Sequence, residues 1–185
     1  MLRKSSASIV LILITAALLF TVSALSVKGD SSAEMIYDGS AAFSHLSPEL
    51  FSENEIDQKY VNEYGGSCID RNGRLVIYYV GEGKALHTLI NSFSSSYPAL
   101  QYSVVLKRVN DSYEDLRLIM DQMWALRNED PVMQKECCMA GINSEMNSID
   151  LYLDCSEERV PYYQQLFRMW PVNYIIAPNF HIEEE

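Results

Sequence analysis

The sequence predicts an α+β fold made of two similar β-β-α-β subdomains joined by a central helix, after an N-terminal signal segment. Residues 64–80 have the pattern of two short strands joined by a tight turn. A looser copy of this hairpin returns near residues 139–153. A helical pattern and a further strand follow each hairpin. The two halves therefore share one order of elements, with one helix to cover each small sheet.

The N-terminus has the pattern of an export signal. Arg3 and Lys4 precede an apolar run at residues 9–20, and small residues end at Ala24. The run is short for a helix that spans a bilayer. We therefore predict that residues 1–24 form a signal peptide and that the chain is secreted or extracytoplasmic. In the alternative, the segment stays uncleaved and tethers the chain to a membrane.

Residues 25–63 are predicted to be a spacer that contains one short helix. Their first part is rich in Ser, Ala, Gly and Asp. A helix is expected within residues 48–63, and its start is open. It begins either at Pro48, because proline suits the first helical position, or at a capping box formed by Ser52 and Glu55.

The first subdomain is predicted at residues 64–109. A turn at residues 70–73 (Asp-Arg-Asn-Gly) separates its first two strands, since Asp caps its own backbone and Asn and Gly tolerate positive φ. A helix follows at residues 83–95 and ends before Pro98. The third strand is expected at residues 102–109. The apolar stripe of the helix consists of Leu86, Leu89, Ile90 and Phe93.

The connecting helix is predicted within residues 110–130. Ser112 and Asp115 have the spacing of a capping box at its start. Apolar residues recur on one of its faces, together with one arginine, and this stripe is interpreted as core rather than as a ligand site. The face consists of Leu116, Ile119, Met120, Met123, Trp124 and Arg127.

The second subdomain is predicted at residues 131–177, and residues 178–185 form an acidic tail. Its elements are strands at 137–143 and 149–154, a helix that begins at or just before Pro161 and ends at Pro171, and a last strand at 172–177. The turn of its hairpin is expected at residues 144–147.

The chain of 185 residues is acidic, with a formal net charge of −11. Removal of the signal peptide takes away two basic residues and no acidic ones. A surface of this sign repels nucleic acid, which binds through Lys and Arg. A basic protein partner or divalent cations would suit the charge, but the simpler interpretation, which we favour, is plain solubility.

Four cysteines follow the signal segment: Cys68, Cys137, Cys138 and Cys155. Export permits disulfides. Neighbouring residues of a strand point to opposite faces, so Cys137 and Cys138 cannot both meet Cys155. The pair Cys138–Cys155 is predicted, with Cys137–Cys155 as the alternative. No cysteine or histidine spacing suits a metal, and no cofactor is expected.

No catalytic constellation is present in the sequence. Of the three histidines, His45 and His181 fall in segments expected to be flexible, and His87 lies in a predicted helix. No nucleophile elbow or phosphate-binding glycine loop occurs. The sequence therefore predicts a protein that is not an enzyme.

Short glycine-centred motifs give the chain a resemblance to a known family. They are Y-G-G-S-C-I-D at residues 64–70, G-R-L-V-I at 73–77, V-V-L-K-R-V-N-D-S-Y-E-D-L at 104–116, A-G-I-N at 140–143 and S-I-D-L-Y-L at 148–153. These segments resemble the pro-region of secreted bacterial chymotrypsin-like serine proteases, of the alpha-lytic protease and streptogrisin type.

The resemblance implies a non-catalytic domain that inhibits its protease and assists the folding of that enzyme. One sheet of such a pro-region packs on the enzyme, and its C-terminal segment lies in the active-site cleft. No protease domain follows here, so we expect a protease partner supplied as a separate protein. In the alternative, the chain is an exported cell-surface interaction module. An exposed patch from Tyr78, Tyr79, Tyr162 or Tyr163 away from the sheet edge would favour that alternative.

Overall fold

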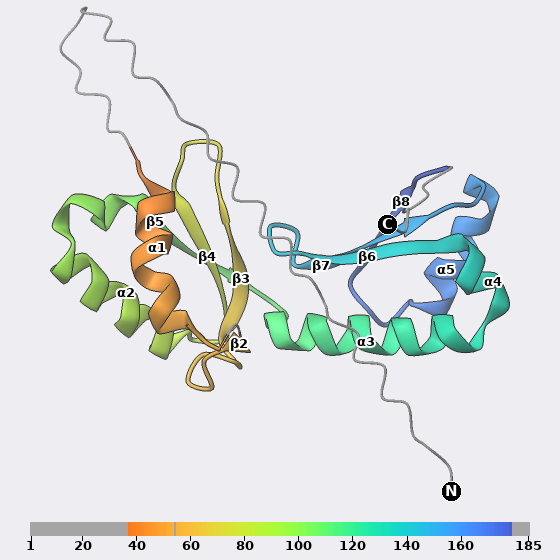
Figure 1. Ribbon diagram of the computed structural model, residues 1–185, viewed down its shortest axis with the longest axis horizontal. Helices are drawn as coiled ribbons and strands as arrows, with labels where there is room; N and C mark the ends of the chain where they lie inside the picture. The colour runs from red at the N-terminus through yellow and green to blue at the C-terminus, as the bar shows by residue number, and fades with distance from the viewer. Residues whose placement is uncertain (1–36, 54, 179–185) are drawn as a thin grey trace, which may run out of the picture. The chain divides into compact units, whose positions relative to one another are not determined.

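The computed structural model describes residues 37–53 and 55–178. They belong to one compact unit, Met35–Glu185 (Figure 1). The predicted signal peptide, residues 1–24, lies outside the described residues, as does the acidic tail beyond Pro178. Among the helices of the described part, none has the length and apolar character needed to cross a membrane.

The first subdomain has the predicted β-β-α-β order. It consists of β3 (Tyr64–Ile69), β4 (Leu75–Val80), α2 (Lys84–Ser96) and β5 (Val104–Val109). The central strand β4 pairs antiparallel with β3 and parallel with β5. A short 3₁₀ helix, η1 (Pro98–Ser103), occupies the place where the sequence predicted the start of the last strand.

The turn between β3 and β4 is held by Asp70. Its Oδ1 accepts hydrogen bonds from the backbone N–H groups of Asn72 and Arg74, both at 2.9 Å. Its Oδ2 accepts two from the Arg74 guanidinium, at 2.9 and 2.7 Å. Gly73 adopts φ 80°, as a turn glycine does. The predicted role of Asp70 in this turn is therefore confirmed.

Replacement of Asp70 by Asn should flatten the acid limb of the stability curve. Hydrogen bonds from the Arg74 backbone and side chain lower the pKa of Asp70 from its ordinary 3.8. A carboxyl with a depressed folded-state pKa stabilises the protein fully above its unfolded-state pKa, and this contribution disappears as the pH falls through its folded-state value. Thermal melts between pH 7 and pH 2 test this.

The control variant for that experiment is Glu82→Gln, since Glu82 pairs with Lys84 while both side chains are about three-quarters exposed or more. Parallel pH profiles for Asp70→Asn and the parent chain would show that the turn contributes no pH-dependent stability.

A helix that begins earlier than the sequence predicted completes the first core. Helix α1 spans Gly39–Leu50, so the expectation of a spacer followed by a helix within residues 48–63 is wrong in its bounds. Ala42, Leu46 and Leu50 are buried in the first core, with at most 1% exposure. Beyond α1 the chain forms a two-stranded hairpin of β1 (Phe51–Ser52) and β2 (Glu55–Ile56).

Helix α2 is capped by the side chain of Glu63, which precedes the helix by about 20 residues. Its N-cap residue, Gly83, has no side chain to offer. Instead, Glu63 Oε2 accepts hydrogen bonds from the backbone N–H groups of Ala85 and Leu86, at 2.9 and 3.2 Å. This satisfies two of the four unpaired donors at the start of the helix.

Glu63→Ala should therefore destabilise the first subdomain by about 1–2 kcal/mol, since loss of an N-capping acceptor costs this much. Glu63→Gln keeps a carbonyl oxygen in place and should lose less. Urea unfolding gives the free energy of unfolding of both variants. If both lose the same amount, the negative charge of Glu63, rather than its acceptor oxygen, provides the stabilisation.

The second subdomain repeats the arrangement of the first. It contains β6 (Cys137–Asn143), β7 (Ser148–Leu153), α5 (Val160–Leu166) and β8 (Val172–Ile176), with β7 in the centre, antiparallel to β6 and parallel to β8. The predicted strands and turn are confirmed, and the helix begins where it was expected, but it ends at Leu166 and not at Pro171. Two short helices were not predicted: α4 (Pro131–Glu136) and the 3₁₀ helix η2 (Glu157–Arg159).

Helix α3 (Tyr113–Glu129) connects the two cores. Its predicted capping box is present, with Ser112 Oγ accepting from the Asp115 N–H at 3.0 Å. Tyr113 packs against the first core, whereas Leu116 and Met123 are buried in the second. The interpretation of the Met-rich stripe as core is confirmed for Leu116, Ile119, Met120 and Met123.

The turn between β6 and β7 is pinned to the segment before α3. Asn147 adopts φ 49°, which asparagine tolerates better than most residues. Its Oδ1 accepts from the N–H groups of Asn110 and Asp111, at 3.1 and 2.9 Å. Its Nδ2 donates to the Asp111 carbonyl at 2.8 Å. This hairpin is therefore fixed by side-chain bonds as well as by its strands.

Candidate functional site

The cysteines proposed for a disulfide lie at the start of the second sheet. Cys137 pairs with Leu153 and is buried in the core, and Cys138 is the extra residue of a β-bulge. Cys155 lies two residues beyond Leu153, so it is not directly opposite Cys137 or Cys138. All four cysteines are free thiols in the structure. The pairing Cys138–Cys155, or Cys137–Cys155, stays a prediction.

Burial sets the acidity of two of these thiols. It raises the pKa of Cys137 to about 11, although a hydrogen bond with Tyr163 lowers it slightly. Burial, and then the nearby Glu136 carboxylate, raises the pKa of Cys155. A thiol whose pKa is raised carries little thiolate at neutral pH, so these groups are poor nucleophiles.

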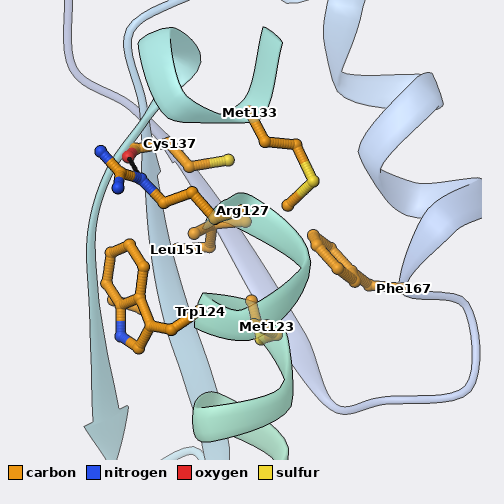
Figure 2. Close-up of a pocket in the computed structure, with 8 residues that line it drawn as sticks. Met123, Trp124, Arg127, Met133, Cys137, Leu151 and Phe167 are labelled. Carbon is orange, nitrogen blue, oxygen red and sulfur yellow. Dashed lines mark hydrogen bonds between the residues drawn. The ribbon is translucent and has the colours of Figure 1, made fainter. Parts of the chain in front are cut away.

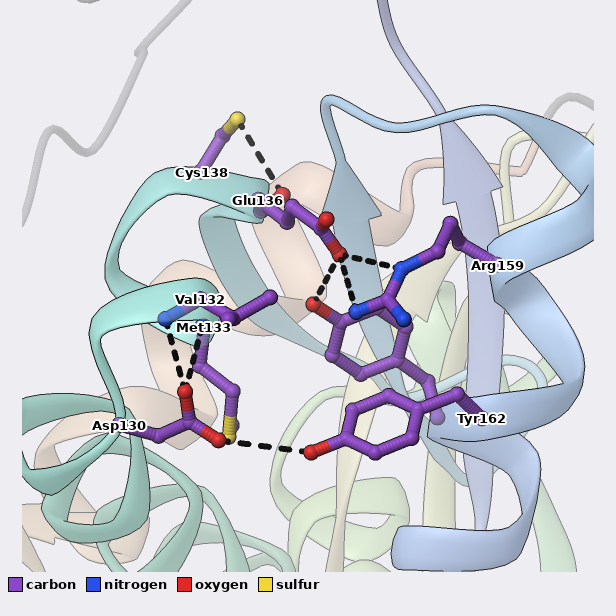
Figure 3. Close-up of polar contacts among 8 residues, drawn as sticks. Asp130, Val132, Met133, Glu136, Cys138, Arg159 and Tyr162 are labelled. Carbon is purple, nitrogen blue, oxygen red and sulfur yellow. Dashed lines mark hydrogen bonds and ion pairs between the residues drawn. The ribbon is translucent and has the colours of Figure 1, made fainter.

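A polar cluster joins α4 to α5 (Figure 3). Glu136 Oε2 accepts from the Tyr163 hydroxyl at 2.6 Å and from the Arg159 Nε and Nη2 at 3.3 and 3.2 Å. The Tyr162 hydroxyl donates to Asp130 Oδ2 at 3.4 Å. Burial and the bond to Glu136 raise the pKa of Tyr163. The cluster satisfies a half-buried carboxylate and fixes α5 against α4, which is a structural role.

A small cavity lies between α3, α4 and the second sheet (Figure 2). Its volume is about 10 Å³, which is at the lower limit for a single water molecule. Arg127 lies at its edge, where its guanidinium is 5.2 Å from the centre of the Trp124 ring. Arg127 Nε also donates to the Cys137 carbonyl at 2.8 Å. The cavity is too small for a substrate.

The histidines that the structure describes pack against aromatic rings. His45 is stacked on Tyr97, with 4.2 Å between ring centres, and His87 lies edge-on to Tyr79 at 5.1 Å. His181 lies outside the described residues. Over residues 37–53 and 55–178, no group of three or more His, Cys, Asp or Glu side chains has an arrangement that could hold a metal ion.

The second sheet has one face that its helices do not cover, and we call it the open face. The helices pack on the other face, where Ile149, Leu151 and Leu153 are at most 2% exposed. Because side chains alternate along a strand, the residues between them point the opposite way. The open face consists of Met139, Gly141 and Asn143 of β6, Asp150 and Tyr152 of β7, and Asn173 and Ile175 of β8.

A carboxylate held by two amides lies at the centre of the open face. Asp150 Oδ2 accepts from Asn143 Nδ2, and Asp150 Oδ1 accepts from Asn173 Nδ2, both at 3.0 Å. The strand β8 next to it pairs only with β7 within the described part, so its outer edge is unpaired there. The first sheet differs, since Val76 and Tyr78 are buried on the face turned away from α1 and α2.

The tyrosines considered for an exposed patch do not form one together. Tyr78 and Tyr163 are buried, with 3% and 0% exposure, whereas Tyr162 is 40% exposed. Tyr162 instead belongs to an apolar strip along α5 and the turn after it, with Leu166 and Met169, which are 41% and 82% exposed.

No family model, curated protein or solved structure matches this chain.

Proposed function

We propose that this chain is an exported, non-catalytic domain that binds a secreted serine protease as an inhibitor and folding partner. The observation that carries the proposal is the open face of the second sheet, next to the unpaired outer edge of β8. An unpaired strand edge binds an extended segment of a partner through main-chain hydrogen bonds, and neighbouring side chains give specificity.

The resemblance to protease pro-regions supports the same proposal. Its motifs lie on the hairpins: residues 64–70 form β3 and the start of the first turn, and residues 148–153 form β7. The repeated β-β-α-β order agrees with two subdomains, of which one presents a sheet to the enzyme. The small cavity and the raised pKa of the Cys137 and Cys155 thiols are compatible with a domain that acts by binding.

Inhibition of secreted chymotrypsin-like proteases from bacteria tests the proposal. Residues 25–185, which contain the whole compact unit, would be incubated with a panel that includes alpha-lytic protease and streptogrisins. We expect slow, tight inhibition in the nanomolar range typical of protease inhibitors. The same protein should also speed the refolding of the protease that it inhibits.

Two variants locate the binding surface. Ile175→Lys puts a charge on the open face beside the β8 edge, and it should weaken inhibition about 100-fold. Deletion of residues 179–185 removes none of the described elements and tests whether the C-terminal segment contributes. A stable wild-type protein that neither inhibits nor refolds any protease of the panel would refute the proposal.

A second candidate is an exported cell-surface interaction module, favoured by the apolar strip of Tyr162, Leu166 and Met169. Helix α5 packs on the helix-covered face of the sheet, so this strip lies away from the open face. A double variant, Leu166→Ser with Met169→Ser, separates the two candidates. If it abolishes binding of a partner while Ile175→Lys does not, the strip is the binding surface.

A further inference from the structure

The central carboxylate of the open face has no cationic partner within the part of the chain that the structure describes. The ion pairs there involve Asp70, Glu82, Glu114, Asp121 and Glu136, and Asp150 is not among them. Asp150 is half-buried, and the amides of Asn143 and Asn173 each donate to one of its oxygens. An ionised carboxylate oxygen has two lone pairs, so each oxygen can accept one more hydrogen bond.

Open space lies beside this carboxylate. Gly141 pairs directly with Asp150, and a Cβ atom added to Gly141 would meet no atom of residues 37–53 and 55–178 within 4 Å. The next pair along the same strands is Met139 with Tyr152, and Ile175 lies beside Tyr152 on β8. A side chain that entered over Gly141 would therefore have an oriented carboxylate at its tip and apolar groups along its length.

We propose that Asp150, oriented by Asn143 and Asn173, is the docking point for an arginine side chain of the protein partner. The planar guanidinium offers two parallel donors to a carboxylate, whereas a lysine ammonium is a compact and strongly hydrated charge. The arginine stem would pack on Met139, as long cationic side chains do on apolar surfaces. The net charge of −11 attracts a cationic partner.

This inference rests on the proposed function for the choice of face, and it deepens that function by stating what the partner presents there. Asn143 and Asn173 come from the two strands on either side of β7. They fix both carboxylate oxygens before the partner arrives, so little ordering of Asp150 remains when the arginine binds.

An NMR titration tests the inference without any protease. Residues 25–185, labelled with ¹⁵N, would be titrated with the peptide acetyl-Leu-Arg-Leu-amide, and separately with its Lys and Glu counterparts. The Arg peptide should shift the side-chain amide signals of Asn143 and Asn173 and the backbone signal of Gly141. The Lys peptide should shift them less, and the Glu peptide should leave them unchanged. Asp150→Asn should abolish the response.

The inference is wrong if the Arg and Glu peptides give the same shifts, or if Asp150→Asn responds as the wild type does. Equal responses to Arg and Lys peptides would also overturn it, since the carboxylate would then select charge alone. Unchanged backbone spectra of Asp150→Asn away from the open face would show that this variant still folds.

Protease inhibition then separates this inference from the proposed function. Asp150→Asn and Gly141→Val should each raise the inhibition constant about tenfold or more. Glu157→Gln, a change of the same charge on η2, should leave it unchanged. Wild-type inhibition that neither variant weakens would overturn the inference and leave the proposed function standing. If the Arg peptide gives the expected shifts but no protease is inhibited, the inference about Asp150 stands and the proposed function is overturned.

Discussion

Tyr163→Ala should lower the free energy of unfolding by about 4 kcal/mol, in the range of large-to-small substitutions in protein cores. The Tyr163 side chain is fully buried in the second core, and its ring lies 6.4 Å from that of Phe167. Truncation would leave a cavity and remove the 2.6 Å hydrogen bond that Glu136 accepts. Few side chains of this domain combine so much buried area with a bond to a carboxylate.

The two contributions of Tyr163 can be separated by a conservative variant. Tyr163→Phe keeps the ring and removes only the hydroxyl, so it should cost about 1.5–3 kcal/mol, as hydrogen bonds to charged groups do. The neighbouring Tyr162→Ala is the matched control, since Tyr162 is 40% exposed and should cost about 1 kcal/mol or less. Urea unfolding of the three variants gives the values. If Tyr162→Ala and Tyr163→Ala lost equal free energy of unfolding, Tyr163 would not be the main contributor to stability that we infer.

Gly39→Ala should separate α1 from the first sheet and cost about 3 kcal/mol, as overpacking of a tight contact does. Helix α1 begins against the backbone of the β3–β4 turn, where the Gly39 N–H donates to the Gly73 carbonyl at 2.7 Å. A Cβ atom at Gly39 would lie 2.7 Å from the Gly73 oxygen and from the Arg74 carbonyl carbon, and closer still to the Leu75 nitrogen. Backbone atoms cannot yield as the end of a flexible side chain can.

Gly141→Ala is the matched control, because the added methyl group meets no atom of the described residues within 4 Å and φ at Gly141 is not positive. We expect a change of about 0.5 kcal/mol or less. Thermal and urea unfolding of both variants measure the difference. If Gly39→Ala proved as mild as Gly141→Ala, the close approach of α1 to the turn would not exist in solution.

The elements predicted best are those whose signals are local. The hairpin turns, the capping box at Ser112 and the helix boundaries near Pro98, Pro131 and Pro161 each depend on a few neighbouring residues, and the structure has them. The bounds predicted for α1 were wrong because serine, glycine and alanine separate its apolar residues and because Pro48 lies inside it. Its burial comes from contacts with strands that follow later in the chain, and no local pattern shows these.

One part of the candidate site could be predicted from a local sequence pattern, and the other part depends on pairing between strands. The alternation of Ile149, Leu151 and Leu153 with polar residues shows that one face of β7 is buried, so the position of Asp150 on the opposite face follows from the sequence. Its amide partners come from β6 and β8, and only the register of the sheet brings them to it. The bulge at Cys138, which shifts the cysteines relative to one another, likewise depends on pairing between strands.

The division of α3 between the two cores affects the order of folding. The first core consists of residues between Ala42 and Tyr113, and the second of residues between Leu116 and Tyr174. The two cores are therefore built from separate, consecutive segments of the chain. A chain that emerges from the ribosome or a translocation channel can therefore complete the first core while the second is still being delivered. The first turn of α3, already held by Tyr113, then serves as the nucleus from which the rest of the helix grows, and so avoids the unfavourable first step of helix formation.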